Sequence, residues 1–168
     1  QMKRTMSNPK AQSQQLAELL FLIEQSYNKK AWHGTNLRGS IRGLSAREAA
    51  WRAGTGRHNI WEIMVHCAYW KYAVRRRILG EKKGSFPLKG SNWFQRSADL
   101  SGQAWREDIK LLESCHRSLL DAVSQLRPGE LNSTPAGSKV SNLAIIVGIA
   151  SHDVYHAGQI QLLKRLQH

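Results

Sequence analysis

The sequence contains no long apolar run, and cysteine is scarce. The longest apolar stretches, such as residues 143–150, are far shorter than the ~18–20 consecutive apolar residues of a membrane span. The charged N-terminal residues have no apolar segment behind them, so we expect neither a membrane helix nor a secretory signal. Two cysteines, Cys67 and Cys115, are too few for a disulfide framework and lie among apolar residues. We therefore expect buried free thiols in a protein of the reducing cytoplasm.

Acidic residues are also few, with 12 Asp and Glu against 25 Lys and Arg, which gives a formal net charge of +13. A pI near 10.3 is a feature of many nucleic-acid-binding proteins. One basic cluster lies at the end of a predicted helix and in the loop after it: Lys71, Arg75, Arg76, Arg77, Lys82 and Lys83. Cations stabilise a helix C-terminus, and no zinc-finger, homeodomain or RNP-type motif accompanies them. We favour a solvated cluster, with binding of nucleic acid or another polyanion as the alternative.

Strand-like alternation is weak throughout, and four segments instead repeat apolar residues at helical spacing. They run from Asn8-Pro9 to about Ala31, from Asn59 to Gly80, from about Ser101 to Arg127 and from about Ser138 to Leu166. Asn8 and Asn59 are good N-cap residues, and Gly80 and Pro128 are typical helix terminators. Two long loops separate these helices, residues 32–58, with one short turn expected near 46–51, and residues 81–100.

Four amphipathic helices in 168 residues, of which 41% are hydrophobic, predict an all-α four-helix bundle. The length favours one domain over residues 1–168, with residues 1–7 flexible. A loop of ~20 residues can span up to ~66 Å, whereas a helix of ~20 residues is only ~30 Å long. Both loops can therefore run the length of the bundle, and simple up-down-up-down order is not required.

Several histidines fall on the apolar stripes of these helices. His152 and His156 are spaced i and i+4 on the last helix, and His66 lies on the stripe of the second. A buried imidazole costs desolvation free energy unless it has a partner, and a divalent metal would satisfy several at once. The alternative is that each is a core histidine with its own hydrogen bond. His116 also lies on an inner stripe, so the pattern alone leaves the third ligand open.

Two segments resemble the DinB/YfiT-like superfamily. Residues 59–70, NIWEIMVHCAYW, resemble its helix with a single histidine, and residues 148–160, GIASHDVYHAGQI, resemble its H-x-x-x-H-x-G-Q-I motif. The resemblance implies a four-helix bundle of up-down-down-up order and a homodimer. It also implies a three-histidine site at His66, His152 and His156 that binds zinc, nickel or another divalent ion. Some members activate a low-molecular-weight thiol for transfer or isomerisation. His116 matches no ligand of the family.

Three neutral imidazoles leave coordination positions open, which is typical of a catalytic metal site. The ion would lower the pKa of a water ligand or bind a thiol as thiolate. We therefore expect a metal-dependent enzyme that carries out thiol transfer or hydrolysis on a small molecule. The alternatives are a basic nucleic-acid or polyanion-binding module and a non-catalytic, stress-associated metal-binding protein.

Glu62 lies one helical turn before His66, on the same face. It is a candidate hydrogen-bond acceptor for a metal ligand or a candidate general base. Its capping-box spacing from Asn59 also gives it a structural role, which we favour.

Other neighbours of the predicted ligands carry weaker expectations. Gln159 is a candidate to contact a ligand and Trp93 a candidate to line a pocket mouth, but neither is the interpretation that we favour, and we expect the tryptophans mostly in the core. We expect Gly158 to allow close helix packing, and Tyr155 and Asp153 to lie at the helix surface or an interface. Cys67 points away from the ligand stripe, so we do not expect it to be a fourth ligand. Six tryptophans and long apolar stripes favour a homodimer through helix faces near Gly158 or Trp105, away from the basic cluster.

Overall fold

The computed structural model describes residues 9–96 and 98–168, and this part of the chain is all-helical, with no strand. The all-α prediction is therefore confirmed, while the Asn8 cap and the predicted flexible residues 1–7 lie outside the described residues. The elements are α1 (Pro9–Tyr27), α2 (Leu37–Ser40), α3 (Ala46–Ala50), α4 (Ile60–Leu79), α5 (Gly102–Ser124), the 3₁₀ helix η1 (Pro128–Asn132) and α6 (Asn142–Leu166).

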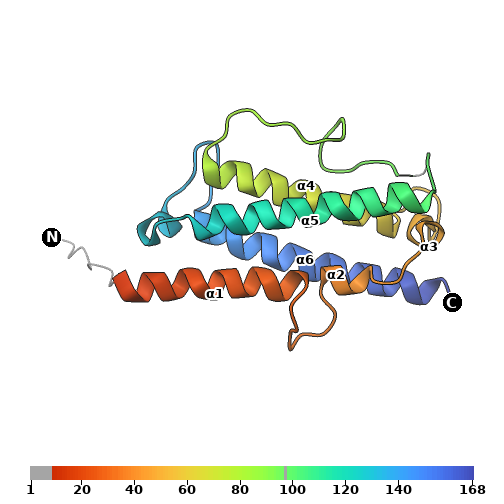
Figure 1. Cartoon of the computed structure of the whole chain (residues 1–168), viewed down its shortest axis with the longest axis horizontal. Coiled ribbons are helices and arrows are strands. Elements are labelled where there is room, and N and C mark those ends of the chain that lie inside the picture. Colours follow the sequence, from red (N-terminus) through yellow and green to blue (C-terminus); the bar gives the residue numbers. More distant parts are fainter. Residues whose placement is uncertain (1–8, 97) are drawn as a thin grey trace.

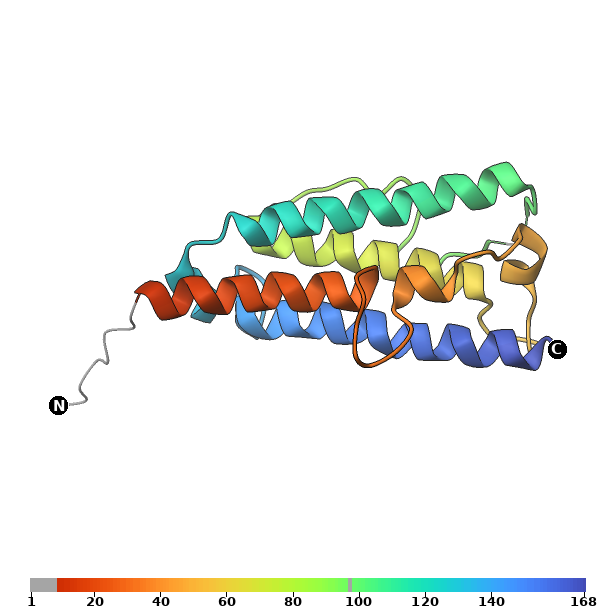
Figure 2. The same cartoon turned by 60° about the horizontal axis from the view of Figure 1, so that its bottom comes forward.

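The four long helices α1, α4, α5 and α6 lie side by side along the longest axis of the molecule (Figure 1). In the same view, α1 and α6 run in one direction and α4 and α5 in the other. The long connection between α4 and α5 returns along the outside of the molecule, so both helices can start at the same end. Figure 2 shows that α2 continues the line of α1 along α6.

Local signals set the ends of α4 as predicted. The Asn59 side chain accepts a hydrogen bond from the Glu62 backbone N–H at 2.8 Å, which caps the first turn. Gly80 ends the helix with φ of +68°, in the left-handed region that glycine adopts without strain.

Other boundaries differ from the prediction. α6 begins at Asn142 rather than near Ser138, because the Ser138 hydroxyl bonds both backbone groups of Val140 and holds a turn there. α1 ends at Tyr27, because the N–H groups of both Asn28 and Lys29 converge on the Glu24 carbonyl. The expected turn near 46–51 is the helix α3, while α2 and η1 were not predicted at all.

Two groups of buried side chains form the core. One lies around Trp61, Met64 and Leu112, and the other around Ile23 and Ile146. Burying each large apolar side chain contributes about 1.5–3 kcal/mol relative to exposure, so these groups hold the long helices together. No helix of the described residues is long and apolar enough to cross a membrane.

Four expectations about the surface and the packing are wrong. Lys71 of the basic cluster and Asp153 have no exposed surface, because they face each other across α4 and α6 and form an ion pair in the core. Trp105 is buried, and its indole N–H donates to the Leu44 carbonyl at 2.9 Å, so its ring cannot form a dimer face. Gly158 is exposed, with open space where a Cβ would lie, and therefore does not serve close packing between helices of one chain.

Candidate metal centre

The structure brings together the three histidines predicted as ligands. His66 projects from α4, and His152 and His156 project from adjacent turns of α6. The Nε2 atom of His152 lies 3.1 Å from the Nε2 atoms of both His66 and His156. The ligand atoms of all three residues lie within 4.8 Å of one another, which is close enough for one ion to reach each.

The outer nitrogens of two of these rings are held by hydrogen-bond acceptors. His66 Nδ1 lies 2.8 Å from the Asn92 carbonyl oxygen, and His156 Nδ1 lies 2.7 Å from Gln159 Oε1. Since a carbonyl oxygen only accepts, each Nδ1 must carry the proton, and each Nε2 then presents a lone pair. Gln159 therefore contacts a predicted ligand, which the sequence offered only as a less favoured candidate. The Nε2 atoms of His66 and His156 carry lone pairs and no proton, so they cannot donate hydrogen bonds to each other. A divalent cation at the point where the three Nε2 atoms converge would accept these lone pairs.

Burial keeps these imidazoles neutral. Desolvation lowers the pKa of His66 to about 4 and that of His152 to about 3. It also lowers the pKa of His156, although the hydrogen bond to Gln159 opposes the shift. Neutral imidazole is the form that binds metals, so no proton has to be displaced at neutral pH.

The loop between α4 and α5 is fixed to the site by Asn92. Its φ of 65° lies in the left-handed region, which asparagine tolerates better than most residues. This conformation lets its carbonyl accept from His66 while its side-chain Oδ1 accepts from the Trp70 indole N–H at 2.9 Å. Asn92 therefore orients the ring of His66 and anchors the loop on α4.

Trp93, the next residue, forms the middle layer of an aromatic stack. Its ring centroid lies 3.9 Å from that of His66 and 3.6 Å from that of His58, with nearly parallel planes on both sides. The stack restricts the rotation of the His66 ring from one side. Trp93 also lines the pocket described below, although the sequence favoured a core position for the tryptophans.

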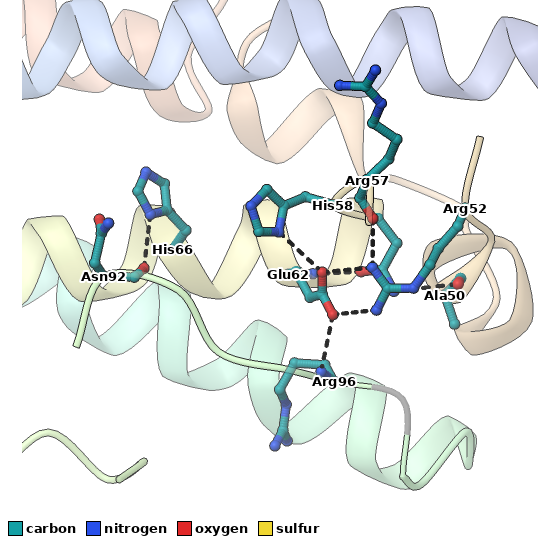
Figure 3. A network of polar contacts seen from close by, with 9 residues as sticks. Ala50, Arg52, Arg57, His58, Glu62, His66, Asn92 and Arg96 are labelled. Carbon is teal, nitrogen blue, oxygen red and sulfur yellow. Dashed lines mark hydrogen bonds and ion pairs between the residues drawn. The ribbon is translucent and has the colours of Figure 1, made fainter. Parts of the chain in front are cut away.

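Glu62 lies at the centre of a polar network that includes His58 (Figure 3). Its carboxylate accepts two hydrogen bonds from the Arg52 guanidinium, one of them at 2.9 Å, and lies 3.2 Å from His58 Nδ1. The Arg96 backbone N–H donates to it at 3.4 Å. Burial alone would raise the pKa of Glu62, but the hydrogen bonds from Arg52 and His58 outweigh it and lower the pKa. The carboxylate thus holds Arg52 and His58 in place.

A pocket of about 580 Å³ opens at His156, which is the member of the three-histidine group that lines it. It is reached by His156 and Gln159 from α6 and by Trp93 and His58 from the loops. The remaining walls are mostly apolar and include Ala53, Ile63, Leu162 and Leu163, together with Arg57 and Tyr155. Its size is that of a small organic ligand.

Other candidates lie outside the three-histidine group. Cys67 offers its sulfur to a different group with His152 and Asp153, and burial raises the pKa of its thiol well above the usual value. His116 is a buried core residue stacked on Tyr27, so its expected core position is confirmed, but its Nδ1 has no hydrogen-bond partner among the described residues.

Sequence reasoning missed Asn92, His58 and Arg52. The i, i+4 spacing of His58 and Glu62 across the N-cap of α4 is a local signal that could have pointed to their contact. Nothing local connects Asn92 to His66, because 26 residues separate them along the chain.

A family model described as the DinB superfamily matches residues 30–160, which include all three histidines. No curated protein and no solved structure matches the chain.

Proposed function

The chain belongs to the DinB superfamily, and from this membership and its three histidines we propose that it is a divalent-metal-dependent enzyme acting on a small molecule. The observation that carries the proposal is the convergence of three buried Nε2 atoms, two of them made lone-pair donors by hydrogen bonds at Nδ1. Zinc or nickel suits a site made of imidazoles. A bound ion supplies Lewis acidity, which makes a water or a thiol more nucleophilic near neutral pH.

The charges around the pocket favour an anionic substrate. Three neutral imidazoles leave the charge of a divalent ion uncompensated, and Arg57 adds another positive charge to the pocket wall. The described residues that line the pocket include no Asp or Glu, while Glu62 is already balanced by Arg52. In this partly apolar pocket, both the metal ion and Arg57 would stabilise a bound anion such as a thiolate or a carboxylate by electrostatic attraction. We therefore propose a low-molecular-weight thiol or hydrolysable acid as the substrate class.

Glu62 has two proposed roles, and its contacts favour one. Its hydrogen bonds from Arg52 and His58 occupy the carboxylate, and its lowered pKa makes it a weak proton acceptor. We propose that it acts as a positioning residue that fixes His58, and through the ring stack Trp93, at the pocket wall, rather than as the general base.

The arrangement of the long helices and the assembly of the chain are further parts of the proposal. We propose that α1, α4, α5 and α6 form an up-down-down-up bundle over one domain, supported by the opposite directions of the two helix pairs in Figure 1. We also propose a homodimer that works in the cytoplasm, where the two buried, unpaired cysteines remain reduced.

Metal titration of protein purified without a histidine tag tests this proposal. We expect one Zn²⁺ or Ni²⁺ per chain with His66, His152 and His156 intact, and loss of binding in His152→Ala. His116→Ala is the matched control, because it removes a buried histidine outside the site. A panel of thiols with an electrophile, run with each metal, then tests the reaction. Absence of binding, or equal affinity in His152→Ala, would contradict the proposal.

A further inference from the structure

A second and larger pocket lies away from the three histidines, where the turn after α2 meets α3 and the first turns of α5. Its volume is about 660 Å³. None of its lining residues lines the pocket beside the metal centre. The two can therefore be occupied and tested independently.

Four arginines surround this second pocket: Arg38, Arg42, Arg47 and Arg106. Among the described residues, a carboxylate partner is found only for Arg38, whose Nε donates to Glu113 at 2.9 Å. Arg42, Arg47 and Arg106 are exposed at the rim of the pocket, whereas the half-buried Arg52 and Arg96 are paired, with Glu62 and Asp108. Within the described part of the chain, the pocket thus gathers three exposed guanidinium groups that have no acidic partner.

The acidic residues near the pocket do not balance these charges. No Asp or Glu belongs to the described lining. Glu48 lies close by, but its carboxylate accepts hydrogen bonds from the backbone N–H and the hydroxyl of Ser45 and completes the cap of α3. Even when Glu48 is counted, three guanidinium groups exceed one carboxylate, so the pocket carries a net positive charge.

The floor of the pocket is apolar and rigid. Ile41 and Trp105 are buried there, and the Trp105 indole N–H is fixed on the Leu44 carbonyl. At the rim, a Cβ on Gly102 would lie 3.1 Å from Nη1 of Arg106, so the absence of a side chain lets this guanidinium lie against the start of α5. An apolar floor beneath a rim of guanidiniums suits a ligand with an apolar body and a multiply charged, oxygen-rich anionic group.

We propose that this pocket binds a small phosphate monoester that carries an aromatic or apolar group. Guanidinium groups match phosphate oxygens in charge and in hydrogen-bond geometry, and two or three of them can share one phosphate. A concave pocket with a closed floor fits a small molecule better than a nucleic-acid strand, which needs an extended basic path. The site is separate from the metal centre and does not depend on its function.

Calorimetric titration with three probes tests the proposal: phenyl phosphate, inorganic phosphate and phenol. We expect phenyl phosphate to bind more tightly than either of the others, because only it engages both the rim and the floor. Arg42→Gln and Arg106→Gln should each weaken phenyl phosphate binding by about tenfold, since each removes a charge-assisted hydrogen bond. Arg117→Gln is the matched control, because it removes an exposed arginine of α5 that lies outside the pocket.

Three results would overturn the proposal. The first is that phenyl phosphate and inorganic phosphate bind with equal affinity. The second is that Arg106→Gln and Arg117→Gln weaken phenyl phosphate binding equally. The third is that a single-stranded oligonucleotide binds more tightly than phenyl phosphate and that Arg42→Gln and Arg106→Gln leave its affinity unchanged. Zn²⁺ titration and circular dichroism of each variant provide separate readouts of the metal centre and the fold. An absence of phenyl phosphate binding at this pocket is therefore distinguishable from an absence of metal binding at the three histidines.

Discussion

Lys71 of α4 and Asp153 of α6 form an ion pair in which neither side chain has any exposed surface. Asp153 directly follows the predicted ligand His152, so the pair joins the two helices that carry the three histidines. The Lys71 ammonium also lies 5.0 Å from the centre of the Tyr27 ring, which places a cation–π contact from α1 on the same group. One buried charge pair thus connects three of the long helices.

Removing one partner of this pair should be costly. Lys71→Met leaves the Asp153 carboxylate buried without its cation, and we expect the free energy of unfolding to fall by about 3–5 kcal/mol. The double variant Lys71→Met/Asp153→Leu removes both charges and should be considerably more stable than the single variant. Urea unfolding of metal-free protein, monitored by circular dichroism, measures the free energy of unfolding of the single and the double variant. Additive losses in the double variant would mean that the two charges are not coupled.

His116 predicts an acid dependence of stability that is independent of the metal site. Burial, with a smaller contribution from Lys71, lowers its pKa to about 2. In the unfolded chain a histidine takes up a proton near pH 6.5, so the unfolded state binds more protons between about pH 6.5 and 2. The stability contributed by neutral His116 is therefore complete above pH 6.5 and is lost as the pH falls.

The variant His116→Gln isolates this contribution, because glutamine does not titrate. Between pH 7.5 and 4.5, the free energy of unfolding of the variant should rise relative to the wild type by about 2–3 kcal/mol. Urea unfolding of the metal-free proteins at both pH values provides the measurement. A difference that stays constant with pH would show that His116 becomes protonated in the folded state.

Features set by short sequence patterns could be predicted, and those set by distant contacts could not. The ends of α4 depend on Asn59 and Gly80, which act within one turn, and the pairing of His152 with His156 follows from helix geometry alone. The choice of His66 over His116 came from the family resemblance, because both residues lie on inner stripes. Periodicity does not specify which helices face each other.

The features that were predicted wrongly or missed also depend on contacts between distant residues or on segments too short to show a pattern. Lys71 belongs to a run of cations that typically lies at a solvated helix end, and only the facing Asp153 of α6 makes its burial possible. Asn92 lies in an irregular loop, where no periodic pattern predicts position. The two short helices α2 and η1 have four and five residues, too few to show a period.

Arg57 provides a test of the proposed anionic substrate. With Co²⁺ in the metal centre, 3-mercaptopropionate should bind more tightly than 1-propanethiol, because Arg57 adds a positive charge to the wall of the pocket that His156 also lines. Arg57→Gln should weaken 3-mercaptopropionate by about tenfold and leave 1-propanethiol unchanged. The absorption spectrum of the Co²⁺ protein reports both affinities.

Arg165→Gln is the control for this experiment, since Arg165 is an exposed arginine of α6 that does not line the pocket beside the histidines. An equal loss in both variants would mean that only the long-range field of the basic protein attracts the anion. Loss of Co²⁺ binding itself would instead point to a damaged metal centre.

The proposed homodimer has a candidate face on α6. Tyr155, Gly158 and Leu162 share one exposed side of this helix, where the tyrosine and the leucine are 64% and 59% exposed. Burial of about 800 Å² per partner, a little over half of it apolar, contributes about 20 kcal/mol before association entropy is subtracted. The opposing charge of +13 per chain is screened over about 8 Å at 0.15 M salt, so repulsion between distant charges is weak.

We therefore expect the wild type to be a dimer at ~50 μM in 0.15 M salt, and Leu162→Asp to be a monomer, because a dimer would bury its unpaired carboxylate. Leu79→Asp is the matched control, since Leu79 is also exposed but lies at the end of α4 beside the basic cluster. Sedimentation equilibrium across ionic strength distinguishes the outcomes. A wild-type monomer at this salt concentration would reject the dimer, and a dimer that forms only above ~0.5 M salt would show that charge repulsion exceeds the contribution of burial.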